Sequence, residues 1–181
     1  IIFYNNISFK AHTYVLFVII TFSLYITTMS LKQVWGNACW YLFHTLAFKL
    51  KNDNANLIRN ILVKIMYICK NLPCPECSQH AVETLSKLNI DLVRTREALI
   101  TVLLQFHNSV NRRTKNPEFS RKEYDEKYNK SNFDAIVIHF IKAMNLRYPT
   151  NERGMANELQ RRIMTNNITE FITKNRHSFN D

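Results

Sequence analysis

Glycine is almost missing from this sequence of 181 residues, in which only Gly36 and Gly154 occur. A glycine-rich loop of the dinucleotide-binding or Walker type needs several glycines close together, so both kinds of phosphate loop are excluded. Any nucleotide cofactor must therefore be held by side chains and helices. Proline is also scarce, with four residues. The shortage of both turn formers favours long helices over a turn-rich sheet.

Acidic residues are fewer than basic ones, 14 against 24, and the formal net charge is +10. Such a surplus is usual for a solvated surface and is sometimes the mark of a nucleic-acid partner. The basic residues alternate with acids in stretches such as RKEYDEKYNK, and no basic run accompanies a nucleic-acid-binding motif. We therefore expect no nucleic-acid partner. The hydrophobic fraction of 46% excludes a disordered chain, and the length suits one domain with appendages.

Long hydrophobic runs are absent except near the start, where Tyr14 to Met29 contains no charged residue and lies between Lys10 and Lys32. This run is shorter than the roughly 20 residues of a membrane-spanning helix, although residues 11–29 together come close. A secretory signal fits poorly because no small-residue cleavage pattern follows. Three interpretations stay open: a membrane anchor at residues 11–29, translated upstream sequence with Met29 as the true start, or a buried helix.

The rest of the chain has helical periodicity, as in the isoleucines and leucines that recur at three- and four-residue steps from Ile58 to Leu72. The predicted helices are Trp35–Leu50, one between KNDNAN and Pro73, Pro75–Leu88, one that carries Leu99 to Val110 and ends before Pro117, and a short one from about Ser120. Two further helices are expected around Pro149. The predicted fold class is all-α: an antiparallel four-helix bundle with a short fifth helix, an N-terminal apolar helix and a helical C-terminal extension.

Cysteine is sparse too, and three of the four cysteines are Cys69, Cys74 and Cys77. An iron–sulfur pattern would need another cysteine downstream, and a zinc site would need Cys39 without paired spacing, so no metal site is predicted. A thioredoxin-like domain would need a strand before CPEC, where a helix is predicted instead. Because Cys74 directly precedes a first helical turn, the helix dipole would lower its thiol pKa. This favours a reactive pair, with a structural disulfide or two inert thiols as the alternative.

Polar side chains gather at two helical sites. Trp40 and His44 lie four residues apart and share a helix face. His107 and Asn111 share a face with Thr114, with Asn108 and Lys115 beside them, and such a polar stripe would be costly to bury empty. An adenine and a diphosphate would satisfy it, with Arg112, Arg113 and Lys115 near the phosphates.

Three segments together, WGNACWYLFHTLA, CPEC and HNSVNRRTKNPEF, resemble the Erv/ALR family of FAD-linked sulfhydryl oxidases, in particular its viral branch in large DNA viruses. The resemblance extends over about Leu31 to Lys130. It implies three parts: an apolar N-terminal segment at 1–30, the FAD-binding oxidase domain at 31–131 and a helical extension of unknown role at 132–181.

The resemblance implies that Cys74 and Cys77 are catalytic, that substrate thiols attack Cys74, and that Cys77 lies against the flavin of FAD, which passes electrons to O2 to give H2O2. It places the following residues around FAD: Lys32, Trp35, Gly36, Trp40, His44, His107, Asn108, Val110, Asn111, Lys115 and Tyr128. Departures from the family pattern are Lys32 for arginine, Tyr128 for a stacking tryptophan, and Lys115 and Asn116 for a glycine-lysine pair. A tyrosine-proline segment after the first helix is also absent.

The expected partners are protein dithiols, including a thioredoxin-like or CxxC relay protein, because this sequence has no further cysteine pair to act as a shuttle. Cys39 and Cys69 are either bonded to each other or free and buried. The resemblance also implies a homodimer, and the expected location is the host cytoplasm or the virion, with a membrane anchor at the N-terminal segment as one of the three open interpretations. The alternative function is a non-enzymatic helical scaffold whose cysteines are structural or bind metal.

Overall fold

The computed structural model describes residues 30–147 and 152–181, with side chains left aside for 152–157. Residues 35–181 form one compact unit. The helices are α2 (Leu31–Phe48), α3 (Ala55–Lys70), α4 (Pro75–Leu85), α5 (Arg96–Thr114), α6 (Arg121–Asn129), α7 (Phe133–Met144) and α8 (Glu152–Asn175), with short 3-10 helices η1 (Ile90–Leu92) and η2 (Arg176–Ser178). The described residues therefore confirm the all-α prediction. The predicted N-terminal apolar helix lies outside them.

α2 begins four residues earlier and ends two residues earlier than predicted. At its start, the Gln33 N–H donates to Oγ of Ser30 (3.2 Å) and the Ser30 N–H donates to Oε1 of Gln33 (2.8 Å), so each residue caps the other. At its end, Leu50 leaves the helix because it forms an isolated antiparallel bridge with Phe179. Sequence periodicity does not reveal that distant pairing.

α3 confirms its predicted apolar face, since Ile58, Ile61 and Ile65 are fully buried. The helix starts after Asn54, whose side chain accepts the Leu57 N–H, and ends before Asn71, which caps it. α4 starts at Pro75 as predicted but ends at Leu85, because the chain there changes to tight turns and the Leu88 N–H bonds back to the Leu85 carbonyl. α6 starts after Ser120 as predicted, and Ser120 forms a capping box with Glu123.

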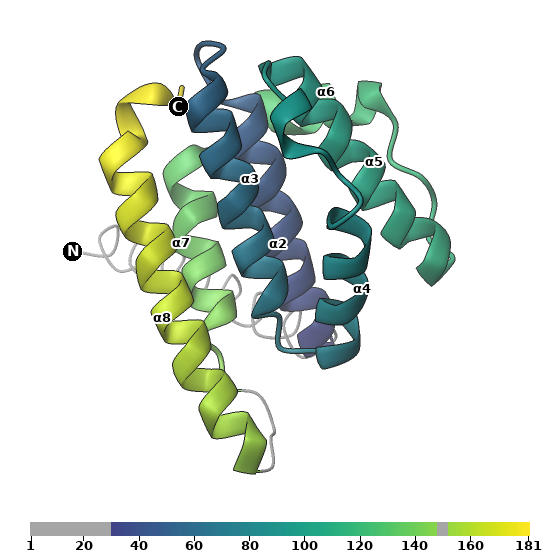
Figure 1. Cartoon of the computed structure of the whole chain (residues 1–181), viewed down its shortest axis with the longest axis vertical. Helices are drawn as coiled ribbons and strands as arrows, with labels where there is room; N and C mark the ends of the chain where they lie inside the picture. The colour runs from purple at the N-terminus through teal and green to yellow at the C-terminus, as the bar shows by residue number, and fades with distance from the viewer. Residues whose placement is uncertain (1–29, 148–151) are drawn as a thin grey trace, which may run out of the picture. The chain divides into compact units, whose positions relative to one another are not determined.

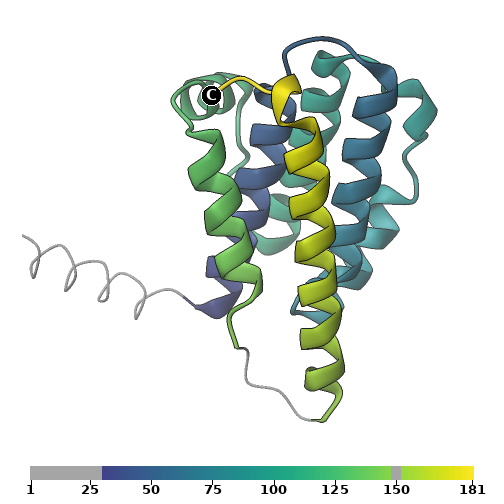
Figure 2. The same ribbon diagram turned by 90° about the vertical axis from the view of Figure 1, so that its left-hand side faces the viewer.

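α2 and α3 lie side by side in the centre, with α4, α5 and α6 on one side and α7 and α8 on the other (Figure 1). A turned view shows the same α7 and α8 beside α2 and α3 (Figure 2). One continuous core joins both sides: Phe140, Met144, Met164 and Ile168 belong to the same buried cluster as the residues of α2 and α3. The C-terminal extension is therefore an integral part of the packed unit. No helix in the described ranges has the length and apolar character needed to cross a membrane.

The C-terminal end of the chain is fastened to the α2–α3 connection. The buried Lys49 donates from Nζ to the carbonyls of Asp181 (2.6 Å) and Asn129 (3.3 Å). The Asn180 N–H donates to the Lys49 carbonyl at 2.7 Å. The ring of Phe179 stacks on Phe133 with centroids 4.9 Å apart. This contact places a residue from the end of the chain inside the core.

Phe179→Ala should lower the free energy of unfolding by about 3 kcal/mol, because it removes a fully buried aromatic ring from the core. Urea unfolding followed by circular dichroism measures the change. Asn180→Ala is the matched control, since the exposed Asn180 contributes only its backbone N–H to the connection and should leave the midpoint unchanged. Equal midpoints for Phe179→Ala and the wild type would contradict this account of the C-terminal contact.

Candidate active site

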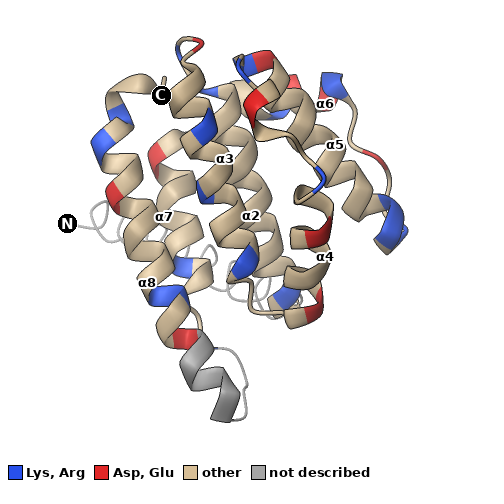
Figure 3. Ribbon diagram, in the orientation of Figure 1, with Lys and Arg blue, Asp and Glu red and all other residues tan. Residues whose placement is uncertain are grey.

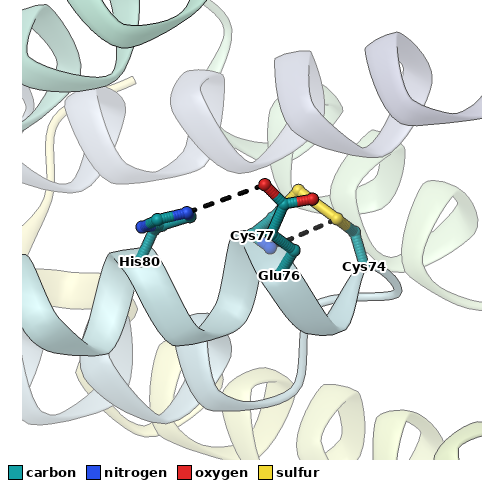
Figure 4. Close-up of a disulfide and its surroundings, with 4 residues drawn as sticks. All are labelled: Cys74, Glu76, Cys77 and His80. Atoms are coloured by element: carbon teal, nitrogen blue, oxygen red, sulfur yellow. Dashed lines mark hydrogen bonds and ion pairs between the residues drawn. A yellow bond between two sulfur atoms is a disulfide. The ribbon is translucent and has the colours of Figure 1, made fainter.

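The Cys74–Cys77 pair forms a disulfide at the start of α4, with the two Cα atoms 5.2 Å apart (Figure 4). Cys74 is the N-cap residue, and its Sγ accepts the Cys77 N–H at 3.2 Å. Both cysteines are half-buried and pack against the core. The free N–H groups and the dipole of α4 stabilise negative charge at Cys74. The predicted position of this pair at a helix start is confirmed.

Two acidic side chains lie around His80 next to the disulfide. His80 Nε2 is 3.7 Å from Glu76 Oε1, and Nδ1 is 3.8 Å from Glu83 Oε2. Both carboxylates are mostly exposed, so these contacts are weak. They keep an imidazole on the same helix face as Cys77, one turn along.

Cys39 and Cys69 are free and buried, so the predicted alternative of two buried thiols is confirmed and a bond between them is not formed. Burial raises the pKa of Cys69 to about 12. It also raises the pKa of Cys39 well above its usual value, with a smaller contribution from nearby Cys69. Cys39 Sγ contacts Met144 Sδ at 3.9 Å. Both thiols stay protonated at neutral pH, so they are poor nucleophiles.

A stack of rings joins α2 to α5. The rings of Trp40 and His107 are nearly parallel, with centroids 4.1 Å apart and planes 9° apart. His44 Nε2 lies 2.9 Å from His107 Nδ1, which makes a hydrogen bond between the two imidazoles. The other nitrogen of His44, Nδ1, is buried and has no hydrogen-bond partner among the described residues. The structure thus brings together three of the residues predicted at the site.

Both imidazoles are held neutral. Burial lowers the pKa of His107 to about 4, and the charge of Lys127 contributes. Burial lowers the pKa of His44 well below its usual value, followed by the effects of His107 and Lys127. A neutral pair can share one proton between Nε2 and Nδ1, whereas two charged rings would repel each other. At least one of the two rings must therefore be neutral for this hydrogen bond to form.

Aromatic residues that the sequence reasoning missed surround the histidines. Lys127 Nζ lies 4.4 Å from the ring centroid of Tyr41 and 5.5 Å from that of Phe119, in cation–π contact. Tyr124 donates its hydroxyl to the His44 carbonyl at 3.0 Å. The signal available in the sequence was the four-residue step from Tyr124 to Tyr128 on one helix face.

Tyr128 is buried, with its ring centroid 5.2 Å from that of His44. It therefore forms part of the packed surroundings of the ring stack. Asn108 donates from its side-chain amide to the Phe119 carbonyl (2.9 Å) and accepts the Phe119 N–H (2.8 Å). Both ends of this amide hold the connection between α5 and α6. Asn108 thus positions Phe119, whose ring lies 5.7 Å from His107.

The remaining predicted positions are dispersed along α2 and α5. Lys32 is exposed and Trp35 is buried, while a Cβ added at Gly36 would meet no atom within 4 Å, so open space lies beside this glycine. Val110 and Asn111 are half-buried. In the described ranges, no three His, Cys, Asp or Glu side chains come together as a metal site.

Lys115 ends α5 in the left-handed conformation, with φ of 59°. Its N–H bonds to the carbonyls of Arg112 and Asn111, which closes the helix end. A side chain is strained at such a φ and glycine is not. This is a physical reason for the glycine that the Erv/ALR family pattern has at this position. Next to it, Arg112 pairs with Glu118 at 2.8 Å, while Arg113 and Lys115 are exposed.

A half-buried disulfide at a helix N-terminus in an all-helical domain is suited to thiol–disulfide exchange. The chain belongs to the Erv1/Alr family, whose sequence profile matches residues 37–129. It is 33% identical over 99 residues to a protein of Invertebrate iridescent virus 3 that bears the name of an FAD-linked sulfhydryl oxidase, with 53% of this chain and 66% of the relative covered. A protein of Fowlpox virus named in the same way is 36% identical over 58 residues, with 32% of this chain and 57% of the relative covered.

The chain thus spans less than two thirds of the length of each of these relatives, 66% of one and 57% of the other. No solved structure matches it.

The buried neutral His107 should make folding sensitive to acid. Its pKa is about 4 in the folded chain and 6.5 ordinarily, so between these values the unfolded chain binds more protons. The free energy of unfolding should therefore fall as the pH falls from 6.5 towards 4, by about 3 kcal/mol for this residue. Urea unfolding at pH 7, 5.5 and 4.5 should show a smaller decline for His107→Gln. The control His139→Gln, at an exposed position, should decline as the wild type does. Equal declines in all three proteins would contradict the assignment.

Lys115→Gly should raise the free energy of unfolding by about 1 kcal/mol, because glycine adopts the left-handed conformation without steric strain. Lys115→Ala is the matched control: it removes the same charge and keeps a Cβ, so it should give no comparable gain. Thermal unfolding of the three proteins measures the difference. If alanine stabilised as much as glycine, the removed charge and not the backbone would be responsible.

Proposed function

We propose that this chain is an FAD-linked sulfhydryl oxidase, which forms disulfides in protein substrates and passes the electrons to O2. The observation that carries the proposal is the Cys74–Cys77 disulfide at the N-terminus of α4, within a domain of the Erv1/Alr family. The names of the two viral relatives agree with it.

The residues present fit FAD. The buried Nδ1 of His44 has no partner among the described residues, which suits a hydrogen bond to a ligand. Trp40 and His107 present parallel flat rings, and the space beside Gly36 is open. Arg113 and Lys115 at the exposed end of α5 supply positive charge for a diphosphate. We assign Trp40, His44 and His107 as the residues that hold the flat part of the cofactor, while Asn108 acts through Phe119.

The first step is attack of a substrate thiolate on Cys74 Sγ, which forms a mixed disulfide and releases Cys77 as a thiolate. A second substrate thiolate then attacks the substrate sulfur of that mixed disulfide and releases Cys74 as a thiolate. Because Cys74 is the N-cap of α4 and accepts the Cys77 N–H, its thiolate is stabilised as a leaving group. The substrate gains one disulfide, and the Cys74–Cys77 disulfide becomes a dithiol.

When bound, FAD supplies the two-electron chemistry that reoxidises this dithiol and reduces O2 to H2O2. Two electrons and two protons leave the substrate thiols and appear in one H2O2, so the reaction balances. Cys39 and Cys69 take no part, because their buried thiols stay protonated. Electrons therefore come directly from the partner, a protein dithiol or a CxxC relay protein.

The homodimer and the location in the host cytoplasm or virion are part of the same proposal. The viral source of both relatives supports an enzyme that oxidises virion proteins where host disulfides are rare. A membrane anchor at residues 11–29, which lie outside the described residues, remains a proposal that only fractionation of the full chain tests.

The purified protein should be yellow with bound flavin and should consume O2 when given dithiothreitol. Cys74→Ala and Cys77→Ala should each reduce this consumption to background while keeping the flavin, because they remove the dithiol and leave the ring stack intact. An oxygen electrode and the visible absorbance spectrum measure the two properties. Cys69→Ala is the matched control and should keep both.

A colourless protein would favour the helical scaffold instead of the enzyme. Oxygen consumption by Cys77→Ala at the wild-type rate would refute the assignment of the cysteines.

A further inference from the structure

An elongated depression, here called the α3–α8 groove, runs between α3 and α8 towards the start of α4. Its larger part has a volume of about 540 Å³ and is lined by residues of α3, η1 and α8, among them Val63, Lys70 and Ile163. Its smaller part, of about 340 Å³, is lined by Lys70, Pro75, Ser78 and residues nearby. Lys70 lines both parts, so the two adjoin at this residue.

The smaller part lies against the first turn of α4, where it is lined by chain neighbours of the two cysteines and not by the cysteines themselves. Pro75 lies between Cys74 and Cys77 in the chain, and Ser78 directly follows Cys77. Pro75 is exposed and both cysteines are half-buried. A segment that lies in the groove would therefore contact the residues that adjoin both cysteines in the chain. From Val63 to Lys70 the groove follows about 10 Å of helix, the length of about three extended residues.

The groove has a distinct chemistry. Val63 and Ile163 are each 47% exposed, which is unusual for two branched apolar side chains that face one groove. Lys64 and Lys70 supply two positive charges, and no carboxylate is among the residues that line either part. Lys64 Nζ is held by Asn167 Oδ1 at 2.6 Å, so its charge is fixed across the groove. Lys and Arg also occur along α3 (Figure 3).

One wall of this groove comes from outside the family match. Gln160, Ile163 and Asn167 belong to α8, whereas the family profile ends at residue 129. The groove therefore requires the C-terminal extension of this chain. A binding surface that extends from the start of α4 onto an added helix is suited to select among substrates, because the disulfide itself reacts with any accessible thiolate.

We propose that the α3–α8 groove binds an extended apolar segment with an acidic residue, next to the reacting cysteine of the protein dithiol substrate. The apolar side chains would cover Val63 and Ile163, and the carboxylate would pair with Lys70 and Lys64. This inference rests on the proposed oxidase function, and it adds the class of substrate.

The test uses two synthetic dithiol peptides of the form Cys-X-X-Cys that differ only in the flanking segment, Leu-Glu-Leu or Leu-Lys-Leu. The wild-type enzyme should oxidise the acidic peptide with a kcat/KM about tenfold higher than the basic one. Lys70→Glu should remove or reverse this preference, and Ile163→Asp should lower kcat/KM for both peptides. Neither variant should change the rate with dithiothreitol, which is too small to occupy the groove.

Two exposed positions outside the groove supply matched controls, Lys122→Glu on α6 and Ile138→Asp on α7. Both should keep the wild-type preference. Peptides with serine in place of cysteine give a second measurement, because fluorescence anisotropy then reports binding without any reaction. Lys70→Glu should weaken binding of the acidic serine peptide about tenfold and spare the basic one.

The two measurements separate the two claims. Selective binding without oxidation of dithiothreitol would refute the oxidase and support the groove. Oxidation of dithiothreitol with equal kcat/KM for both peptides, unchanged in Lys70→Glu, would refute the groove and leave the oxidase. A dimer in sedimentation that Ile163→Asp converts to a monomer, with peptide selectivity unchanged, would assign the groove to a second copy of the chain and overturn the proposal.

Discussion

Burial of α2 between two groups of helices is the constraint on which the other features depend. Ala38 and Leu42 share one face of this helix, Ala47 lies on the opposite face, and all three are fully buried. A helix that is apolar all round must be enclosed by other elements. This enclosure fixes Trp40 and His44 beside α5, and it places the end of α2 where Leu50 can pair with Phe179. The site and the C-terminal contact are thus two consequences of one buried helix.

The same burial determines the electrostatics of the site. It removes His44 fully and His107 partly from water and lowers the pKa of both, so an acceptor nitrogen stays available for the hydrogen bond between the imidazoles. The dithiol follows the opposite rule: Cys74 lies at a half-buried helix start, where N–H groups stabilise negative charge. Cys39 and Cys69 lie in the buried core instead, and there desolvation raises the pKa of both thiols. Position relative to the core therefore separates the reactive thiols from the inert ones.

Much of the fold was predictable because local signals carry it. Pro75 starts α4, the Ser120–Glu123 box starts α6, and the isoleucines of α3 mark its buried face. The ring stack was predictable in part, because a helix face unites Trp40 with His44, but only the packing of α2 against α5 brings His107 to them. Sequence reasoning missed Lys127. Its ammonium group is in cation–π contact with the rings of Tyr41 on α2 and of Phe119 in the α5–α6 connection. It also missed the packing of the C-terminal extension into the core, since no periodicity reports which helices meet.

That packing changes how the C-terminal extension must be understood. Met144 contacts Cys39 of α2, and Asn167 holds Lys64 of α3, so α7 and α8 cover apolar surface of the two central helices. Each buried side chain of this size contributes about 1.5–3 kcal/mol, so Phe140, Met144, Met164 and Ile168 together are a large share of the stability of a domain of ordinary size. A second copy of the chain cannot occupy the part of α2 and α3 that α7 and α8 already cover. The proposed homodimer would therefore have to use a surface that these helices leave open, so the extension would restrict how copies associate as well as form a wall of the α3–α8 groove.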